Sequence, residues 1–148
     1  MTKQTQSTEI NASPEKVFAF GISERMNEVW GEWMEGKWTS EGPVGVGSIC
    51  HFDTKGTFSS FGELKGEVTE FEKNKKMTIH TKDAKGKMDA TDSLVLEPTT
   101  KGTKVTYITE YKVPYSVLGK LIDKISISKH METMHVKMLE NLKKALEA

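Results

Sequence analysis

One acidic residue interrupts an otherwise apolar face of a predicted strand. Alternation along residues 88–96 places Asp92 on the same side as Met88, Ala90, Leu94 and Leu96. A carboxylate on that side loses its water, which raises its pKa unless a partner offsets the loss. Such a group could act as an acid or a base on an enolisable ligand. Alternatively, a strand bulge or the end of the sheet lets Asp92 reach water.

Two tyrosines could add phenol groups beside this carboxyl group. Tyr107 and Tyr111 share one face of the last predicted strand with Val105, Thr109 and Val113. Asp92 and Tyr107 are therefore the candidate catalytic pair. A buried tyrosine can also do no more than hydrogen-bond the backbone, so this pattern alone assigns no catalytic role.

Three tryptophans lie close together after the first helices that the sequence predicts. Trp30, Trp33 and Trp38 fall within nine residues of one another. One or two of them could be ordinary core residues. Three at such short spacing also fit the aromatic wall or rim of a pocket.

The remaining reactive residue types do not form motifs. The four histidines offer one pair at i and i+5, His130 and His135, and none at the i, i+4 spacing of a zinc-binding helix. Alternation puts His80 on the solvent side, while His135 falls near an apolar stripe, as a packing residue does. The single Cys50 has no nucleophile motif around it, and residues 42–47 lack the phosphate-loop patterns. We expect no metal and no cofactor.

Length and charge place the protein among single-domain globular chains. It has 148 residues, with 21 basic and 21 acidic side chains, so it lacks the positive surface that binds nucleic acid. Residues 1–6 lack the apolar core of a signal peptide, and no apolar run is as long as a membrane span. We expect a cytoplasmic protein without an integral membrane segment, either a monomer or a weak homodimer.

The elements that must hold these residues follow a simple order. Residues 4–10 suit an edge strand, and Ser13-Pro14-Glu15 is a typical helix start, with a second short helix after Ser23. Five alternating runs separated by turn residues then predict an antiparallel meander: residues 48–53, 62–71, 77–82, 88–96 and 103–113. With a long helix at the end, this order indicates an α+β domain whose sheet is covered on one face.

The terminal helix, residues 115–148, carries two apolar stripes that differ in phase. Leu118, Leu121, Ile122 and Ile125 form the first stripe, and Met131, Met134, Met138, Leu142 and Leu146 form the second. An unbroken helix of this length measures about 48 Å, against a radius of gyration of about 15 Å for such a domain. We therefore predict a bend or break between Ile125 and Lys129.

Several phrases spread along the chain resemble the START-like, or SRPBCC, superfamily, in particular its polyketide cyclase/dehydrase-type branch. They are Ile10-Asn11-Ala12-Ser13-Pro14-Glu15-Lys16-Val17-Phe18, the Trp30–Trp33 segment, residues 42–48, Gly66-Glu67-Val68-Thr69-Glu70-Phe71, Leu96-Glu97-Pro98, residues 102–107 and Leu142-Lys143-Lys144. The resemblance implies one domain over residues 1–148 with the helix-grip fold. In that fold, an antiparallel sheet of six to seven strands wraps a long C-terminal helix and leaves an apolar cavity.

The resemblance does not fix one function, because related proteins include carriers, cyclases and chaperone activators. We expect binding of a small hydrophobic molecule, lipid-, polyketide- or aromatic-like, because the chain is rich in Met and Trp. The alternatives are a cyclase- or dehydratase-type enzyme that uses Asp92 and a tyrosine, and a protein-interaction role. The expected ligand-binding residues are Trp30, Trp33, Phe52, Leu94, Tyr107, Tyr111, Leu118 and Ile122.

Overall fold

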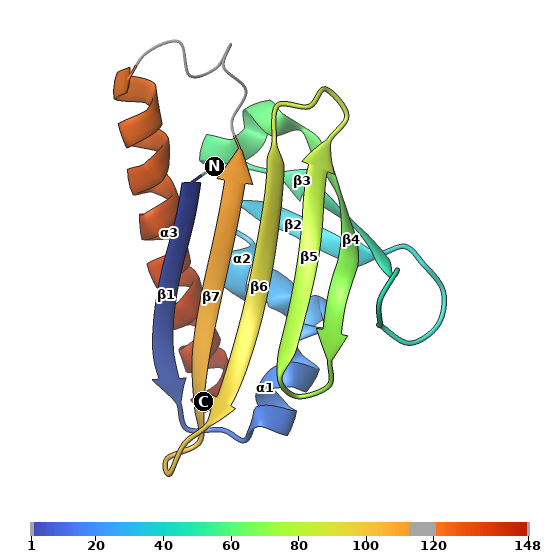
Figure 1. The fold of residues 1–148 in the computed structure, drawn as a ribbon, viewed down its shortest axis with the longest axis vertical. Helices are drawn as coiled ribbons and strands as arrows, with labels where there is room; N and C mark the ends of the chain where they lie inside the picture. Colours follow the sequence, from blue (N-terminus) through green and yellow to red (C-terminus); the bar gives the residue numbers. More distant parts are fainter. Residues whose placement is uncertain (1, 113–120, 148) are drawn as a thin grey trace.

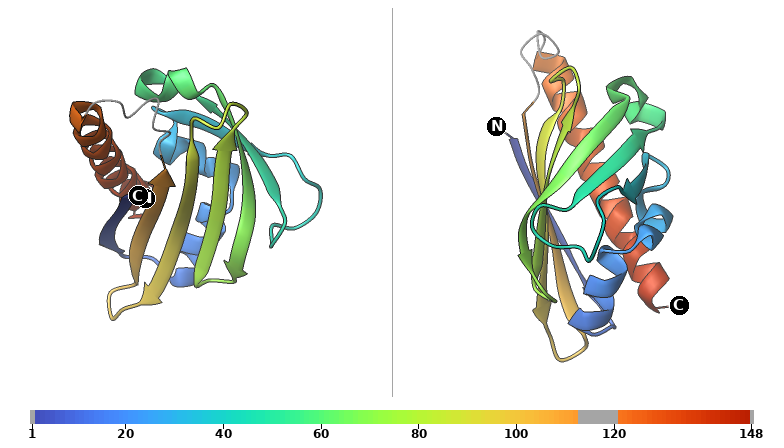
Figure 2. Two further views of the ribbon diagram at one scale, coloured as in Figure 1. Left: turned by 45° about the horizontal axis from the view of Figure 1, so that its top comes forward. Right: turned by 90° about the vertical axis from the view of Figure 1, so that its right-hand side faces the viewer.

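The chain folds into one curved antiparallel sheet with all of its helices on the concave side (Figures 1 and 2). The computed structural model describes residues 2–112 and 121–147, and for residues 57, 60 and 121–127 it describes the backbone only. The seven strands follow the order β1-β7-β6-β5-β4-β3-β2. Their bounds are β1 Thr2–Ile10, β2 Met34–Trp38, β3 Ile49–Thr54, β4 Glu63–Glu72, β5 Lys76–Asp83, β6 Asp89–Pro98 and β7 Thr103–Lys112. The predicted helix-grip fold is confirmed.

The first helices begin where their capping residues predict. Ser13 caps α1 (Pro14–Gly21) by accepting a hydrogen bond from the backbone N–H of Lys16, and Pro14 occupies the first turn. Ser23 caps a 3₁₀ helix, η1 (Glu24–Met26), which continues into α2 (Asn27–Trp30). The predicted pair of short helices after the first strand is therefore present.

Strands β3 to β7 form the predicted meander, and β1 closes the sheet by pairing with β7. Asn74 turns the chain between β4 and β5 with φ of 64°, a left-handed conformation that asparagine tolerates better than most residues. A register shift between Val68 and Glu70 is where β4 bulges, two strands away from Asp92. The alternative reading needed a bulge at Asp92 in β6, but the register shift lies in β4 instead.

The terminal helix α3 (Leu121–Glu147) lies across the concave face, from the open end of the sheet down to α1 and α2 (Figure 2). It is continuous between Ile125 and Lys129, so the predicted break is wrong. The second apolar stripe packs as expected, with Met131, Met134, Met138 and Leu142 all buried. The side chains of the first stripe lie outside the described residues. None of the helices in the described ranges has the length and apolar character of a membrane span.

Two elements were not predicted. The five-residue strand β2 pairs with β3 at the edge of the sheet, and a 3₁₀ helix, η2 (Gly56–Phe61), connects β3 to β4. Both contribute side chains to the space between sheet and helices, so they bear on the site described next.

Candidate functional site

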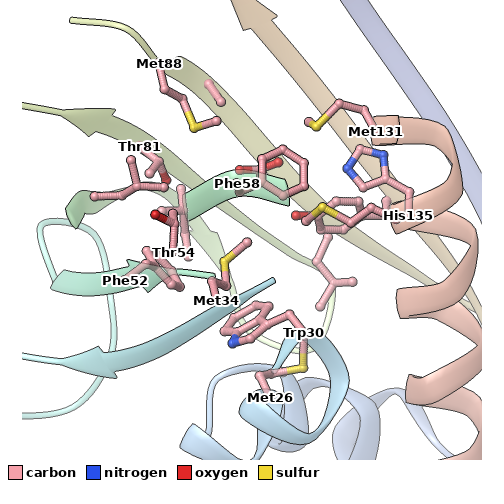
Figure 3. Close-up of a pocket in the computed structure, with 18 of the residues that line it drawn as sticks. Met26, Trp30, Met34, Phe52, Thr54, Phe58, Thr81, Met88, Met131 and His135 are labelled. Carbon is pink, nitrogen blue, oxygen red and sulfur yellow. The ribbon is translucent and has the colours of Figure 1, made fainter. Parts of the chain in front are cut away.

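The concave face of the sheet and the helices enclose a cavity of about 100 Å³ (Figure 3). Strands β2 to β7 form its floor, while η2, α2 and α3 supply its cover. An engineered cavity of about 150 Å³ with apolar walls binds benzene, so this space suits a molecule of about one ring.

Methionine dominates the lining. Six of the eight methionines of the chain line the cavity: Met26, Met34, Met77, Met88, Met131 and Met134. They come from η1, β2, β5, the residue that precedes β6, and α3, so they surround the space on several sides (Figure 3). The methionine side chain is unbranched and polarizable, and therefore adapts to ligands of different shape.

Trp30 and Phe52 form an aromatic end of the cavity. Their rings meet edge to face with centroids 5.5 Å apart, and the Trp30 indole N–H donates to Asn27 Oδ1 at 2.9 Å. Phe52 lies over two glycines of the flanking strands. A Cβ atom at Gly36 of β2 would come within 2.7 Å of the Phe52 ring, and one at Gly66 of β4 within 3.3 Å. The absence of side chains at these positions leaves room for the ring.

Asp92 lies in the middle of β6 and lines the cavity. Its cross-strand neighbour Thr109 on β7 donates a hydrogen bond from Oγ1 to Asp92 Oδ1 at 2.6 Å. Burial raises the pKa of Asp92, and the hydroxyl groups of Thr109 and Tyr107 partly offset that rise by stabilising the carboxylate. Asp92 therefore faces inward as the strand alternation predicts, no bulge lies at this position, and part of its side chain stays accessible.

Tyr107, also predicted to face inward, lines the cavity beside Asp92. Burial raises its pKa well above the usual value, and the negative charge of Asp92 raises it further. The phenol consequently keeps its proton at neutral pH and can only donate or accept hydrogen bonds. The Tyr107 ring packs edge to face on His135, with ring centroids 4.9 Å apart.

His135 of α3 completes this polar corner, and sequence reasoning assigned it only a packing role. It is 1% exposed, lines the cavity, and places Nε2 3.2 Å from Thr109 Oγ1. Burial lowers its pKa to about 4, so the ring is neutral at pH 7. Its position between the buried Met131 and Met138 on one helical face signalled burial but not contact with a cavity.

The predicted lining needs correction at two positions. Trp30, Phe52, Leu94 and Tyr107 line the cavity, whereas Trp33 and Tyr111 are buried without lining it. Because α2 ends at Trp30, Trp33 lies in the turn that leads to β2 and no longer shares the helical face of Trp30. Tyr111 lies near the end of β7, opposite Thr2 and Ala90, and packs in the core. Leu118 and the side chain of Ile122 fall outside the described residues.

The other reactive residues lie away from this corner. The His80 ring contacts Asp89 on the outer face of the sheet, Nε2 to Oδ1 at 2.6 Å, and His51 is exposed. Cys50 is buried, and desolvation raises the pKa of its thiol to about 11, which leaves it unreactive. Within residues 2–112 and 121–147, no three His, Cys, Asp or Glu side chains come together as a metal-binding group.

Comparisons with known proteins agree with this architecture. A family model described as polyketide cyclase / dehydrase and lipid transport matches residues 1–147. A protein from Thermus thermophilus has a TM-score of 0.78 at 16% identity, with 98% of this chain and 97% of that chain covered. The Aha1 dimer from Colwellia psychrerythraea has a TM-score of 0.69 at 22% identity, covering 99% and 97%.

A third similar structure is the di-domain ARO/CYC StfQ from the steffimycin biosynthetic pathway. Its TM-score is 0.75 at 11% identity, with 98% of this chain and 50% of that chain covered. At these identities, the likeness to solved structures shows the fold alone. The comparison with curated proteins gave no match.

Proposed function

This chain belongs to the polyketide cyclase / dehydrase and lipid transport family, and we propose that it binds a small, mostly apolar organic molecule in the cavity between its sheet and α3. The observation that carries the proposal is a cavity of about 100 Å³ lined mainly by methionine, aromatic and aliphatic side chains, with a polar corner at Asp92 and the hydroxyl-bearing Thr54 and Thr81 as its other polar residues. Apolar walls with a few convergent polar groups are the usual composition of a ligand site. The cavity favours this role over a protein-interaction role, which would need a surface feature instead.

The size of the cavity limits the ligand. Sites for drug-sized molecules measure about 300–1,000 Å³, whereas this one measures about 100 Å³. A single ring or a short chain matches this volume better than a molecule of several fused rings does. Affinity would come mainly from apolar area removed from water, at about 25 cal/mol per Å² before the ordering costs.

The methionines provide a direct test. We would label their methyl groups with ¹³C, titrate the protein with p-xylene, and follow the methyl signals by NMR. The six methionines of the lining should shift, with the largest changes nearest the ligand. Met138 is an internal control, because it is buried on the same helix but does not line the cavity. Absence of shifts, or shifts at Met138 without shifts at Met131 and Met134, would contradict the proposal.

A second measurement addresses the natural ligand. Native mass spectrometry of freshly purified protein would reveal a co-purifying molecule and its mass. A bound species with the mass of a one-ring or short-chain compound would support the proposal. A species much too large for the cavity would show that the site opens considerably in use.

An acid–base role is the second candidate, because Asp92 and Tyr107 meet inside the cavity and the pKa of Asp92 is raised. In that role Asp92 would remove a proton from carbon, with the Tyr107 hydroxyl stabilising the enolate oxygen. The test is deuterium uptake into cyclohexanone in D₂O at neutral pH. Wild type should accelerate the uptake and Asp92→Asn should not. Equal rates for both proteins would eliminate this role.

A further inference from the structure

A second, smaller cavity lies beyond the aromatic end of the main one. It measures about 30 Å³, against about 100 Å³ for the main cavity. The residues that line both spaces are Gly21, Trp30, Phe52, Met77 and Ile79. Those that line the second cavity alone are Ser23, Glu24, Gly36, Lys37, Trp38 and Cys50. One water-sized group needs about 10–15 Å³ of such space, so the second cavity holds about two.

The order of residues along β2 and β3 places Phe52 between the two cavities. Alternate residues of β3 face inward in the order Cys50, Phe52, Thr54. Cys50 lines only the second cavity, Thr54 only the main one, and Phe52 both. On β2, Trp38 pairs with Cys50 and lines the second cavity, while Met34 pairs with Thr54 and lines the main one. The two cavities therefore follow one another along these strands, with the Phe52 ring as the partition.

Phe52 is the part of this aromatic end that a ligand can displace. Trp30 is held, because its indole N–H donates to Asn27 Oδ1 at 2.9 Å. The Asn27 side chain is in turn joined to β2, accepting from the Gly36 N–H at 2.7 Å and donating to the Gly36 carbonyl at 2.9 Å. The Phe52 ring has no polar atom, and empty space lies on each side of it. Close packing normally holds a core ring in place. Here a chain can turn the ring aside, at the cost of its edge contact with Trp30.

We propose, building on the ligand-binding function above, that the site takes a ring that bears a straight alkyl chain. The ring occupies the main cavity, and the chain passes Phe52 into the second cavity. Trp38 and Cys50 offer the chain apolar contacts there, and both belong to the sheet. The rim of the second cavity carries Glu24 and Lys37, which are exposed. A chain long enough to pass this rim returns to water and gains no further affinity.

A homologous series tests the length of the site: ethylbenzene, n-butylbenzene and n-hexylbenzene, titrated by calorimetry. Each CH₂ moved from water into an apolar space tightens binding about fourfold. The second cavity holds about two such groups, and turning Phe52 aside offsets part of the gain, so n-butylbenzene should bind about five- to tenfold more tightly than ethylbenzene. n-Hexylbenzene should bind within about twofold of n-butylbenzene, because its last carbons reach the rim. An equal gain at both steps would contradict the proposal.

Two variants at one position locate the chain. Cys50→Leu places a larger side chain in the second cavity, so the preference for n-butylbenzene over ethylbenzene should fall to about twofold or less. Cys50→Ala enlarges the same space and should keep or increase that preference. Ala90→Val is the matched control, since it narrows the main cavity and should weaken both ligands without changing their ratio. A preference in Cys50→Leu equal to that of wild type would overturn the inference.

The wild-type protein allows a direct measurement that depends on no variant. Cys50 is the single cysteine of the chain, so ¹³C-labelled cysteine gives one Cβ signal. With n-butylbenzene bound, we expect a nuclear Overhauser effect between its terminal methyl group and the Cys50 Cβ protons. The ring protons should instead contact the Met131 methyl group in the main cavity. Binding without the Cys50 contact would overturn the inference while leaving the proposed function standing, and binding of no member of the series would overturn both.

Discussion

His135 stabilises the folded protein only while its ring is neutral. Its pKa is lowered to about 4 by burial, whereas the unfolded chain has the ordinary value of about 6.5. Between these values the unfolded chain takes up a proton that the folded chain does not, so acid favours unfolding. Stability is complete above about pH 6.5 and falls as the pH drops towards 4.

The His135→Leu variant isolates this effect. From about pH 7.5 to about pH 4.5, wild type should lose about 2–3 kcal/mol of unfolding free energy relative to the variant. Among the described side chains, Tyr107 packs on the ring and Asp92 is linked to it through Thr109; both proteins retain these groups, so the difference between them reports His135. Urea unfolding at several pH values provides the measurement. If the difference in unfolding free energy between wild type and His135→Leu does not change with pH, the His135 ring accepts a proton inside the folded protein and the prediction is wrong.

Asp92 has the opposite pH dependence. Because its folded pKa is raised, the folded chain keeps its carboxyl proton to a higher pH than the unfolded chain does. Stability associated with Asp92 is therefore present at low pH and is lost as the pH rises through the folded pKa. We expect Asp92→Asn to be more stable than wild type at about pH 8, with a smaller advantage at about pH 4. An advantage of equal size at both pH values would contradict this.

At the scale of elements, three neighbouring strands cooperate to position one ring of the site. Phe52 of β3 lies between Gly36 of β2 and Gly66 of β4, and its edge meets Trp30 of α2. A methyl group at Gly36 would collide with the Phe52 ring, whereas one at Gly66 would meet Cys50 Sγ at 2.7 Å and Ile79 at 2.9 Å before the Phe52 ring at 3.3 Å. Small residues on flanking strands thus determine where an aromatic wall lies, and the glycines are part of the site although neither is reactive.

We expect Gly36→Ala and Gly66→Ala each to lower the unfolding free energy by about 1–3 kcal/mol and to weaken p-xylene binding. Gly45→Ala is the matched control, since its Cβ meets nothing within 4 Å and the loop can accept it. Trp30 fluorescence should change in the first two variants because Phe52 packs against that indole. Wild-type stability in Gly36→Ala would mean that the ring has room to move.

Elements with a clear period or cap could be predicted from sequence, and those without one could not. Ser13 and Pro14 mark the start of α1, and alternation marks five of the strands. Strand β2 has the sequence Met-Glu-Gly-Lys-Trp, with glycine as its one buried residue, so no apolar alternation shows it. Helix η2, Gly-Thr-Phe-Ser-Ser-Phe, is too short for a helical period.

The residues of the site likewise divide into those that the sequence could predict and those that it could not. A strand period of two placed Asp92, Leu94 and Tyr107 on the inner face, and all three line the cavity. Helical phase also marked His135 as buried, but phase cannot tell a packed position from one beside a space. That distinction depends on how α3 sits over the sheet. It is a property of the whole molecule.

At that scale, the two ends of the chain close the fold. Strand β1 runs beside α3 (Figure 1), where Gln4 Nε2 donates to the Ser128 carbonyl at 2.6 Å and the Asn11 N–H donates to Glu147 Oε2 at 2.9 Å. These bonds join residues 124 and 136 positions apart. The polar corner therefore forms only when nearly the whole chain is in place, because Asp92 and Thr109 belong to the sheet and His135 to the helix that closes it.

A cavity maintained by such a fold should carry a stability cost that a substitution can recover. Ala90 of β6 is buried and lines the cavity, so Ala90→Val adds two methyl groups to open space. At about 0.8 kcal/mol per buried CH₂, the unfolding free energy should rise by up to about 1.6 kcal/mol, while p-xylene binding weakens. Val105 of β7 is also fully buried but lies away from the cavity.

Val105→Ile is the matched control, since it adds one carbon where no space exists and should destabilise by about 1–3 kcal/mol. Both variants carry a β-branched residue at the changed strand position, so low strand propensity would not explain a loss of stability in either. Urea unfolding and p-xylene titration of the two variants give the sign of each effect. If Ala90→Val raises the unfolding free energy and Val105→Ile lowers it, the protein maintains an open space at the expense of stability, as a binding site requires. If both variants are destabilised, the region around Ala90 is close-packed and the ligand must enter elsewhere.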